Sequence, residues 1–567
     1  MDKRLSIALL LTAIVVAVTP LLFPTPRKAS PVISATQTGT ASVSPTTPVQ
    51  AAPATAPGVT ASTPASVPAG SAVLSAVKTD SPAVTANVPV QAQTSAITTT
   101  KAVYRFSNMG ASLLSATMRG YKNLATKKGE VELHLQGRPL VSFALVLNRD
   151  TVSLNQTAFQ VTQDRPDSMA TSVTYSAVVG GSNVAISYKV DPEHYMLHMA
   201  GRVTGAASPA YLLISLPSTL PATETDTVMD LRALAYSFKP ERDNAQGVPF
   251  AKLDPGEKRL EPGPLTWTAV KNKYFVVGLI NPEKSSFEEM TLTGGPRTSK
   301  IATSATATIV KAIKNDAFAF DMYVGPQQSA ELLAVGRDFD HVNPYGWRIL
   351  QPVINPIAAL CIKLLLWMHS HLKLSYGWVL IIFGIFIRVI LWPLNQSAMR
   401  SSMKMQEIQP RLAEVQKRYK DNPEKQREEM MKVYSEAGAS PFTALSGCLP
   451  MLIPMPVLFA LFFVFQNTIE FRGVPFLWLL DISVRDPLFI LPVLMGISMY
   501  LLSWIGMRNA PPNPQAKMMS YMFPVMMTFI LANMASGLNL YYTAQNMASL
   551  PQQWLLARER AKARKPA

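Results

Sequence analysis

Hydrophobic and polar residues alternate with different periods along the 567-residue chain, and these periods divide it into parts. Residues 5–23 form an apolar run behind a short charged stretch. A cleaved signal peptide usually has a shorter apolar core with a small-x-small site just after it, whereas this run is followed by PTPRKAS. Residues 1–23 therefore predict an uncleaved signal anchor, with a cleaved signal as the alternative. Residues 24–100 are rich in Ala, Thr, Ser and Pro and cannot bury a core, so they predict a disordered tether.

Residues 101–345 contain short segments in which apolar and polar residues alternate. Segments 172–179 and 183–190 flank Gly180-Gly181-Ser182, a pattern typical of a β-hairpin. No stretch in this part is long and apolar enough to cross a membrane. We therefore expect one β-rich domain of sandwich type. It carries no nucleophile, phosphate-loop or metal-ligand motif, so we expect neither an enzyme nor a bound cofactor.

From residue 346 onward the pattern becomes that of a polytopic α-helical membrane protein. Residues 346–374 mix apolar residues with Asn355, Pro356 and Lys363, which favours an amphipathic helix in the interface. The five predicted spans that follow are residues 375–394, 449–467, 487–505, 518–535 and 538–556. With the anchor this makes six. The last span contains Asn539, Gln545 and Ser549 among other polar residues, which a helix tolerates only when it packs against protein or water.

Positive charge decides the predicted orientation. The formal net charge is +16. Basic residues are dense in the loop 395–448 and in the tail 557–567, and sparse in the loop 468–486. The positive-inside rule therefore places the long loop and both termini in the cytoplasm, and the β-rich domain in the periplasm of a Gram-negative cell. Because the basic residues lie beside apolar segments, they indicate anionic lipids as partners rather than nucleic acid.

Arg388 is the single charged residue in the apolar segment 377–394. A guanidinium at the centre of a spanning helix costs roughly 2.5–3.5 kcal/mol on insertion scales. One interpretation is that Arg388 faces protein or a water-filled cavity and marks a functional site. The other is that the side chain extends to the nearer headgroups. The segment alone leaves both open.

Residues 397–437 of the basic loop predict a helical hairpin. Asp421-Asn422-Pro423 ends one helix and starts the next. The apolar residues expected to hold the two arms together are Ile408, Leu412, Val415, Tyr419, Met430 and Tyr434. Such a hairpin is either a solvated link between spans or a docking arm for a ribosome, a targeting receptor or a nascent chain.

Several segments, taken together, resemble the YidC insertase family. They are residues 320–327, 345–370, 386–394, 403–434, 447–462 and 536–542. The resemblance implies a five-helix insertase core around a hydrophilic groove and a periplasmic β-supersandwich. It also implies an insertase and chaperone that inserts nascent membrane proteins, alone or with the Sec translocon.

The resemblance also implies roles for individual residues. Arg388 corresponds to the groove arginine, with Tyr541 and Tyr542 lining the contact path. Met455, Leu458 and Ile530 fall where the family has its hydrophobic slide. The methionines of segment 518–527 suit such a slide or, alternatively, fill a core.

Three positions depart from the family pattern. Gly384 replaces a groove residue that is often polar, and Pro454 replaces a groove amide. Ser440-Pro441 replaces the usual Asn-Pro before the third span. The first two departures put the polarity of the groove in question. The third departure puts the hinge of the hairpin in question.

Two other classes of protein compete with this interpretation. A solute or ion transporter also uses intramembrane arginines, but it is typically built from inverted repeats, which this sequence does not display. A binding module would use the sandwich to recruit periplasmic partners or carbohydrate, with the spans only as anchors.

Overall fold

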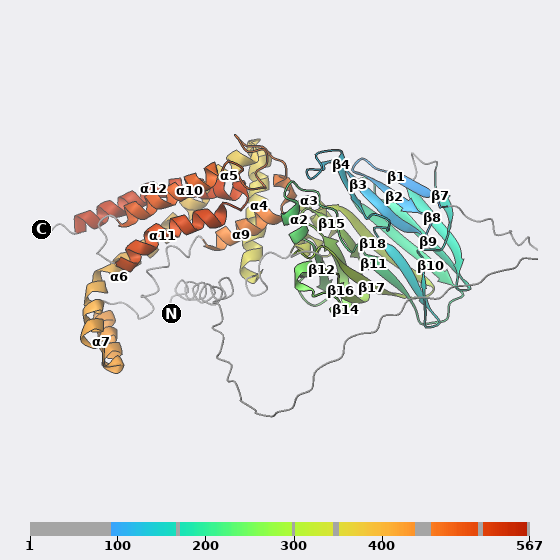
Figure 1. The fold of residues 1–567 in the computed structure, drawn as a ribbon, viewed down its shortest axis with the longest axis horizontal. Coiled ribbons are helices and arrows are strands. Elements are labelled where there is room, and N and C mark those ends of the chain that lie inside the picture. The colour runs from blue at the N-terminus through green and yellow to red at the C-terminus, as the bar shows by residue number, and fades with distance from the viewer. Residues whose placement is uncertain are drawn as a thin grey trace, which may run out of the picture. The chain divides into compact units, whose positions relative to one another are not determined.

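The computed structural model describes residues 92–165, 171–297, 301–343, 351–436, 455–507 and 514–563. The predicted anchor 1–23 and most of the predicted tether lie outside these residues. The described chain consists of a β-rich domain followed by a set of helices (Figure 1). Strand β1, Thr94–Thr98, lies inside the segment that we assigned to the tether. The predicted end of the tether at residue 100 is therefore wrong, because β1 alternates exposed and buried positions and inserts Ile97 into the core.

A four-stranded antiparallel sheet forms one layer of the β-rich domain, in the order β1-β2-β3-β4. Its other strands are β2 (Ala102–Ser107), β3 (Ser112–Lys122) and β4 (Glu130–His134).

A fourteen-stranded sheet forms the larger layer, in the order β6-β5-β11-β17-β16-β14-β15-β18-β10-β9-β8-β7 with β12 and β13 attached to β14. The strands are β5 (Ser142–Leu147), β6 (Asp150–Ser153), β7 (Gln160–Gln163), β8 (Ser172–Val179), β9 (Ser182–Val190), β10 (Met196–Thr204), β11 (Ala210–Leu216), β12 (Ala235–Pro240), β13 (Gln246–Pro249), β14 (Lys258–Lys271), β15 (Phe275–Ile280), β16 (Phe287–Gly294), β17 (Ala305–Ile313) and β18 (Ala317–Pro326). One contiguous core of apolar side chains holds the domain together, including the fully buried Trp267, Tyr188 and Phe238.

The predicted hairpin is confirmed as strands β8 and β9. Its register pairs Val179 with Ser182 across the two-residue loop Gly180-Gly181. Both glycines have positive φ, 54° and 82°, which is the conformation that a tight hairpin turn requires. Short helices complete the domain: α2 (Thr227–Arg232), η1 (Phe250–Lys252), α3 (Ser329–Val335) and η2 (Phe339–Val342).

The helical part contains α4 (Gln351–Leu372), α5 (Tyr376–Ile390), α6 (Trp392–Arg418), α7 (Pro423–Glu436), α9 (Met455–Asn467), η4 (Ile469–Phe471), α10 (Ile490–Met507), α11 (Pro514–Leu531) and α12 (Ser536–Ala563). Helix α12 packs against α5 and α10, α11 packs against α10, and α9 packs against α4. Helix α12 extends beyond the predicted end at residue 556, because the good helix formers of ARERAKA continue it.

The predicted span 375–394 is broken at Leu391, where α5 ends and α6 begins. Pro393 explains the break, because it has no N–H to donate to the carbonyl of the residue four positions earlier. Asn395 stabilises the junction by donating from its Nδ2 to the Leu391 carbonyl at 3.0 Å.

Among the described residues, the two helices α4 and α10 are long and apolar enough to cross a membrane, and three shorter apolar helices lie at 376–390, 455–467 and 517–531. For α4 these criteria of length and composition also admit a spanning helix, whereas we expected an interfacial one. The buried residues of α4 follow one face, as in Ala358, Cys361 and Leu365, while Leu360 and Trp367 are exposed. The number of spans and the lipid depth of α4 remain predictions.

Candidate functional site

Arg388 lies near the C-terminal end of α5, and its side chain faces α12. It is only 8% exposed. Its Nη2 donates to Oε1 of Gln552 on α12 at 2.5 Å, while its buried Nε–H has no partner. Among the ion pairs of the described residues, none joins Arg388 to a carboxylate. The guanidinium is therefore a buried cation held by a neutral acceptor, and not a side chain that extends away from the protein.

Gln552 was missed in the sequence analysis, although it continues the series of polar residues on α12. It is 1% exposed. Its Nε2 donates to the Trp392 carbonyl and to Oε1 of Gln396, both at 3.3 Å, on the first turns of α6. A signal was present in the sequence, since a glutamine one turn beyond Ser549 prolongs the polar face of a helix predicted to need protein contacts.

The contact between α5 and α12 is close at Gly384. A Cβ added there would lie 3.1 Å from the Tyr541 carbonyl oxygen and 3.4 Å from the Ala544 Cβ. The position that we expected to lack a groove hydroxyl is thus a site of tight helix packing, where a larger residue would push the helices apart. Tyr541 is fully buried, with its ring 5.8 Å from that of Phe383.

Tyr542 is only partly buried and lies 5.8 Å from the Tyr541 ring in an edge-on arrangement. The two tyrosines thus differ in environment. The structure brings Arg388, Gly384 and Tyr541 to one helix contact, with Tyr542 beside it.

The polar face of α12 is buried against protein, as its sequence requires. Asn546 donates from Nδ2 to the Ser498 hydroxyl on α10 at 3.0 Å. Asn539 donates to the Leu531 carbonyl at the end of α11 at 2.9 Å. Gln545 and Ser549 are also buried. A helix with these groups facing lipid would leave several hydrogen-bonding groups unsatisfied, so the predicted span 538–556 requires these neighbours.

The proposed slide residues lie on separate helices. Met455 and Leu458 are on α9, which packs against α4 and contacts α12, and Leu458 is buried. Ile530 is on α11 and is exposed. Four methionines of α11 are also exposed, namely Met518, Met519, Met522 and Met526. The exposure of these four argues against the alternative that they fill a core, whereas the fifth methionine, Met527, is partly buried. Pro454 and Ser440-Pro441 lie outside the described residues.

Helices α6 and α7 pack against one another through a small apolar cluster. Leu412 and Tyr434 are buried in it, with Ile408 and Met430 packed alongside. Asn422 caps α7, since its Oδ1 accepts from the Lys425 backbone N–H at 3.2 Å. Val415 and Tyr419 of the predicted stripe are partly buried, which leaves much of the hairpin surface polar.

The segment between α9 and α10 contacts the β-rich domain through buried charges. Arg472 donates from Nε to both carboxylate oxygens of Glu224 at 2.9 Å, and from Nη2 to the carbonyls of Lys122 and Thr223. Glu470 accepts from the Ser329 backbone N–H at 3.0 Å, at the start of α3. Burial raises the pKa of Glu470.

The same segment also meets the start of α12. The backbone N–H groups of Ser536 and Gly537 donate to the carbonyls of Val484 and Ile482, at 2.7 and 2.9 Å. One loop therefore bonds both to the β-rich domain and to the helix that holds Gln552.

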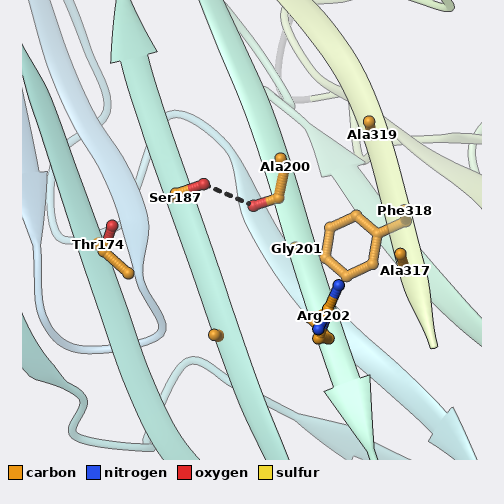
Figure 2. A pocket seen from close by; sticks show the side chains of 9 residues that line it. Thr174, Ser187, Ala200, Gly201, Arg202, Ala317, Phe318 and Ala319 are labelled. Atoms are coloured by element: carbon orange, nitrogen blue, oxygen red, sulfur yellow. Dashed lines mark hydrogen bonds between the residues drawn. The ribbon is translucent and has the colours of Figure 1, made fainter.

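A groove on the β-rich domain is lined by strands β8, β9, β10 and β18 (Figure 2). Most of its lining residues are small, and the Ser187 hydroxyl donates to the Ala200 carbonyl at 3.2 Å. The Phe318 ring lies against Gly201, next to Arg202. No three His, Cys, Asp or Glu side chains in the described parts of the chain are grouped to hold a metal ion.

Both the β-rich domain and the helical part of the chain match known protein families. The family model described as YidC periplasmic domain matches residues 94–357, and the model described as 60Kd inner membrane protein matches residues 367–564. The membrane protein insertase YidC of Pelodictyon phaeoclathratiforme is 31% identical over 490 residues, which are 79% of this chain and 80% of that protein. The insertase YidC of Chloroherpeton thalassium is 35% identical over 54% of each chain.

Among solved structures, an active YidC insertase with its first transmembrane domain resolved is 18% identical, with a TM-score of 0.33 over 82% of this chain and 94% of that one. Two family models match the chain in sequence order. A membrane protein insertase is identical to it at nearly a third of positions over most of both chains. The chain belongs to the YidC family of inner-membrane proteins with a periplasmic domain, whose curated relatives are membrane protein insertases.

Proposed function

We propose that this chain inserts apolar segments of nascent proteins into the inner membrane, and that Arg388 receives acidic groups of the polar flank that must cross. The observation that carries this proposal is the buried guanidinium at the α5–α12 contact, which has a neutral acceptor and an unsatisfied N–H. Such a group lacks a counter-charge, and an acidic side chain of a substrate supplies one.

Electrostatics gives the size of this attraction. Two unit charges 4 Å apart attract by about 1 kcal/mol in bulk water and about 4 kcal/mol at an effective dielectric constant of 20. The membrane potential adds about 2.3 kcal/mol per charge per 100 mV. With the outside positive, this term draws an acidic group outward. Both terms are comparable to the cost of moving one carboxylate into the membrane on insertion scales.

The apolar part of the substrate then leaves into lipid along α9 and α11. Met455 on α9 and Ile530 with the exposed methionines on α11 present apolar side chains for this step, whereas Leu458 is buried in the packing of α9. Each Leu, Ile or Phe of the substrate gains roughly 0.3–0.6 kcal/mol at the centre of a spanning helix. About twenty such residues outweigh one or two charges, so no nucleotide is needed to drive the step.

The proposal includes an orientation and partners. The chain crosses the membrane six times with both termini in the cytoplasm, residues 1–23 as the anchor and the β-rich domain in the periplasm. The basic hairpin α6–α7 then faces the ribosome or a targeting receptor, and the protein works alone or with the Sec translocon. The density of Lys and Arg between residues 395 and 448 supports this orientation and contact with anionic lipids.

Insertion into proteoliposomes that contain only this chain tests the proposal. Two substrates share one apolar segment, and their translocated tails differ only in carrying two acidic residues or none. Arg388→Ala should lower insertion of the acidic tail several-fold more than that of the neutral tail. Arg558→Ala is the matched control, because Arg558 lies on the exposed side of α12 and stacks on Trp554 at 3.4 Å. Equal insertion of the acidic tail by Arg388→Ala and the unaltered chain would refute the role of this residue.

A further inference from the structure

The amide of Gln552 lies between the Arg388 guanidinium and the first turns of α6. We propose that Gln552 is a positioning residue, which holds Arg388 toward the α5–α12 contact while leaving its charge unneutralised and so available to an acidic substrate group. This inference rests on the proposed function of Arg388, and it assigns a role to a residue outside the resemblance described above.

The surroundings of Gln552 fix which way its amide points. Its NH2 group has two donors, and the Trp392 carbonyl and the Gln396 Oε1 both lie 3.3 Å from Nε2. The flipped orientation would set NH2 against the guanidinium, donor against donor, and turn Oε1 toward the Trp392 carbonyl. Only the observed orientation satisfies these groups, so Oε1 faces Arg388.

The neutrality of Gln552 is as important as its position. A carboxylate in the same place would form a charge-assisted, bidentate pair with the guanidinium and satisfy it. An amide oxygen accepts one bond from Nη2 and leaves the buried Nε–H without a partner. The cation is therefore held in one place and still has a donor for another acceptor.

The next residue of α12 supplies a matched control. Gln553 is the same residue type, but it points to α10, where its Oε1 would lie 3.6 Å from a Cβ added at Gly506. Gln553 is partly buried. A general effect of removing an amide side chain from this part of α12 should therefore occur at both positions. A positioning effect on Arg388 should occur only at Gln552.

The experiment uses the full chain in proteoliposomes with the acidic-tail and neutral-tail substrates. The quantity measured is the ratio of their insertion yields. Gln552→Met removes the acceptor and Gln552→Glu replaces it with a competing charge. A hydrogen bond to a charged group corresponds to a factor of roughly ten or more in an equilibrium. We expect both variants to lower the ratio by at least about threefold, whereas Gln553→Met keeps it unchanged.

A double variant adds a second readout. In the Arg388→Ala background, Gln552→Met should cause no further fall in the ratio, because the group that it positions is gone. An equal loss of both substrates in Gln552→Met would instead indicate a merely structural role and overturn the inference.

The outcomes also separate this inference from the proposed function. A normal ratio in both Gln552 variants, together with a lowered ratio in Arg388→Ala, would refute the positioning role alone. A normal ratio in Arg388→Ala would refute both proposals.

Discussion

Replacing Arg472 should release the loop 468–486 from the β-rich domain. The side chains of Arg472 and Glu224 are 6% and 3% exposed, so the pair is almost fully desolvated. Arg472→Met leaves the Glu224 carboxylate buried without its cation and removes a donor from the carbonyls of Lys122 and Thr223. Removing one partner of a buried ion pair costs about 3–5 kcal/mol.

Hydrogen exchange of the loop measures this cost. The backbone N–H groups of Phe476 and Ile482 donate to the carbonyls of Leu479 and Val474 at 2.9 and 3.0 Å, and they exchange when the loop opens. Each 1.4 kcal/mol corresponds to a factor of ten, so the predicted cost raises their exchange rates by roughly a hundredfold or more. The measurement uses the full chain in a lipid nanodisc, and mass spectrometry follows the exchange of peptides that cover residues 468–486.

Two further variants separate the loss of the ion pair from a general effect of removing an arginine. Arg485→Met is the matched control, because Arg485 is an exposed arginine of the same loop. Removing both charges with Arg472→Met and Glu224→Met should restore most of the protection, since no unpaired charge remains buried. Unchanged exchange in the single variant Arg472→Met would contradict the reasoning, because a pair that can be broken at no cost does not fix the loop.

Three other perturbations test separate parts of the structure. Asn422→Ala removes the cap of α7 and should destabilise the hairpin by about 1 kcal/mol, seen as faster amide exchange in residues 423–436. Gly201→Ala places a Cβ against the Phe318 ring and should destabilise the β-rich domain by about 1–3 kcal/mol in pulse proteolysis, a loss that a second change, Phe318→Leu, should reduce. Burial lowers the pKa of Lys311 to about 8 from 10.5, so the unfolded domain binds more protons between these values. Its stability should therefore rise as the pH increases from 8 to 10, and Lys311→Met should flatten this slope.

Local patterns were sufficient to predict much of the fold. The two glycines at 180–181 and the flanking alternation located β8 and β9, and Asn422-Pro423 located the start of α7. These features depend on short-range steric and capping effects, which the sequence contains directly. Strand β1 was missed because its flanking residues have the composition of the tether, and only pairing with β2 makes it a strand.

The partner of Arg388 could not be predicted in the same way. The arginine was recognisable because a charge in an apolar segment is costly, but Gln552 lies 164 positions away in sequence. Which polar residue of α12 meets it depends on the rotation and depth of two packed helices. The packing at Gly384 could not be predicted either, because it depends on the same two helices. The sequence indicated only a missing hydroxyl, whereas helix packing leaves almost no room for a side chain there.

The buried amides and hydroxyls of α12 also bear on how this protein is itself made. Asn539, Gln545 and Asn546 would meet hydrocarbon if the helix left the translation machinery and partitioned alone, and lipid offers them no hydrogen-bond partner. Helices α5 and α10 precede α12 in the chain and provide its contacts, so they must be in place before α12 can settle. As a predicted span, α12 of this proposed insertase would thus depend on assistance during its own biogenesis, supplied by its own earlier segments.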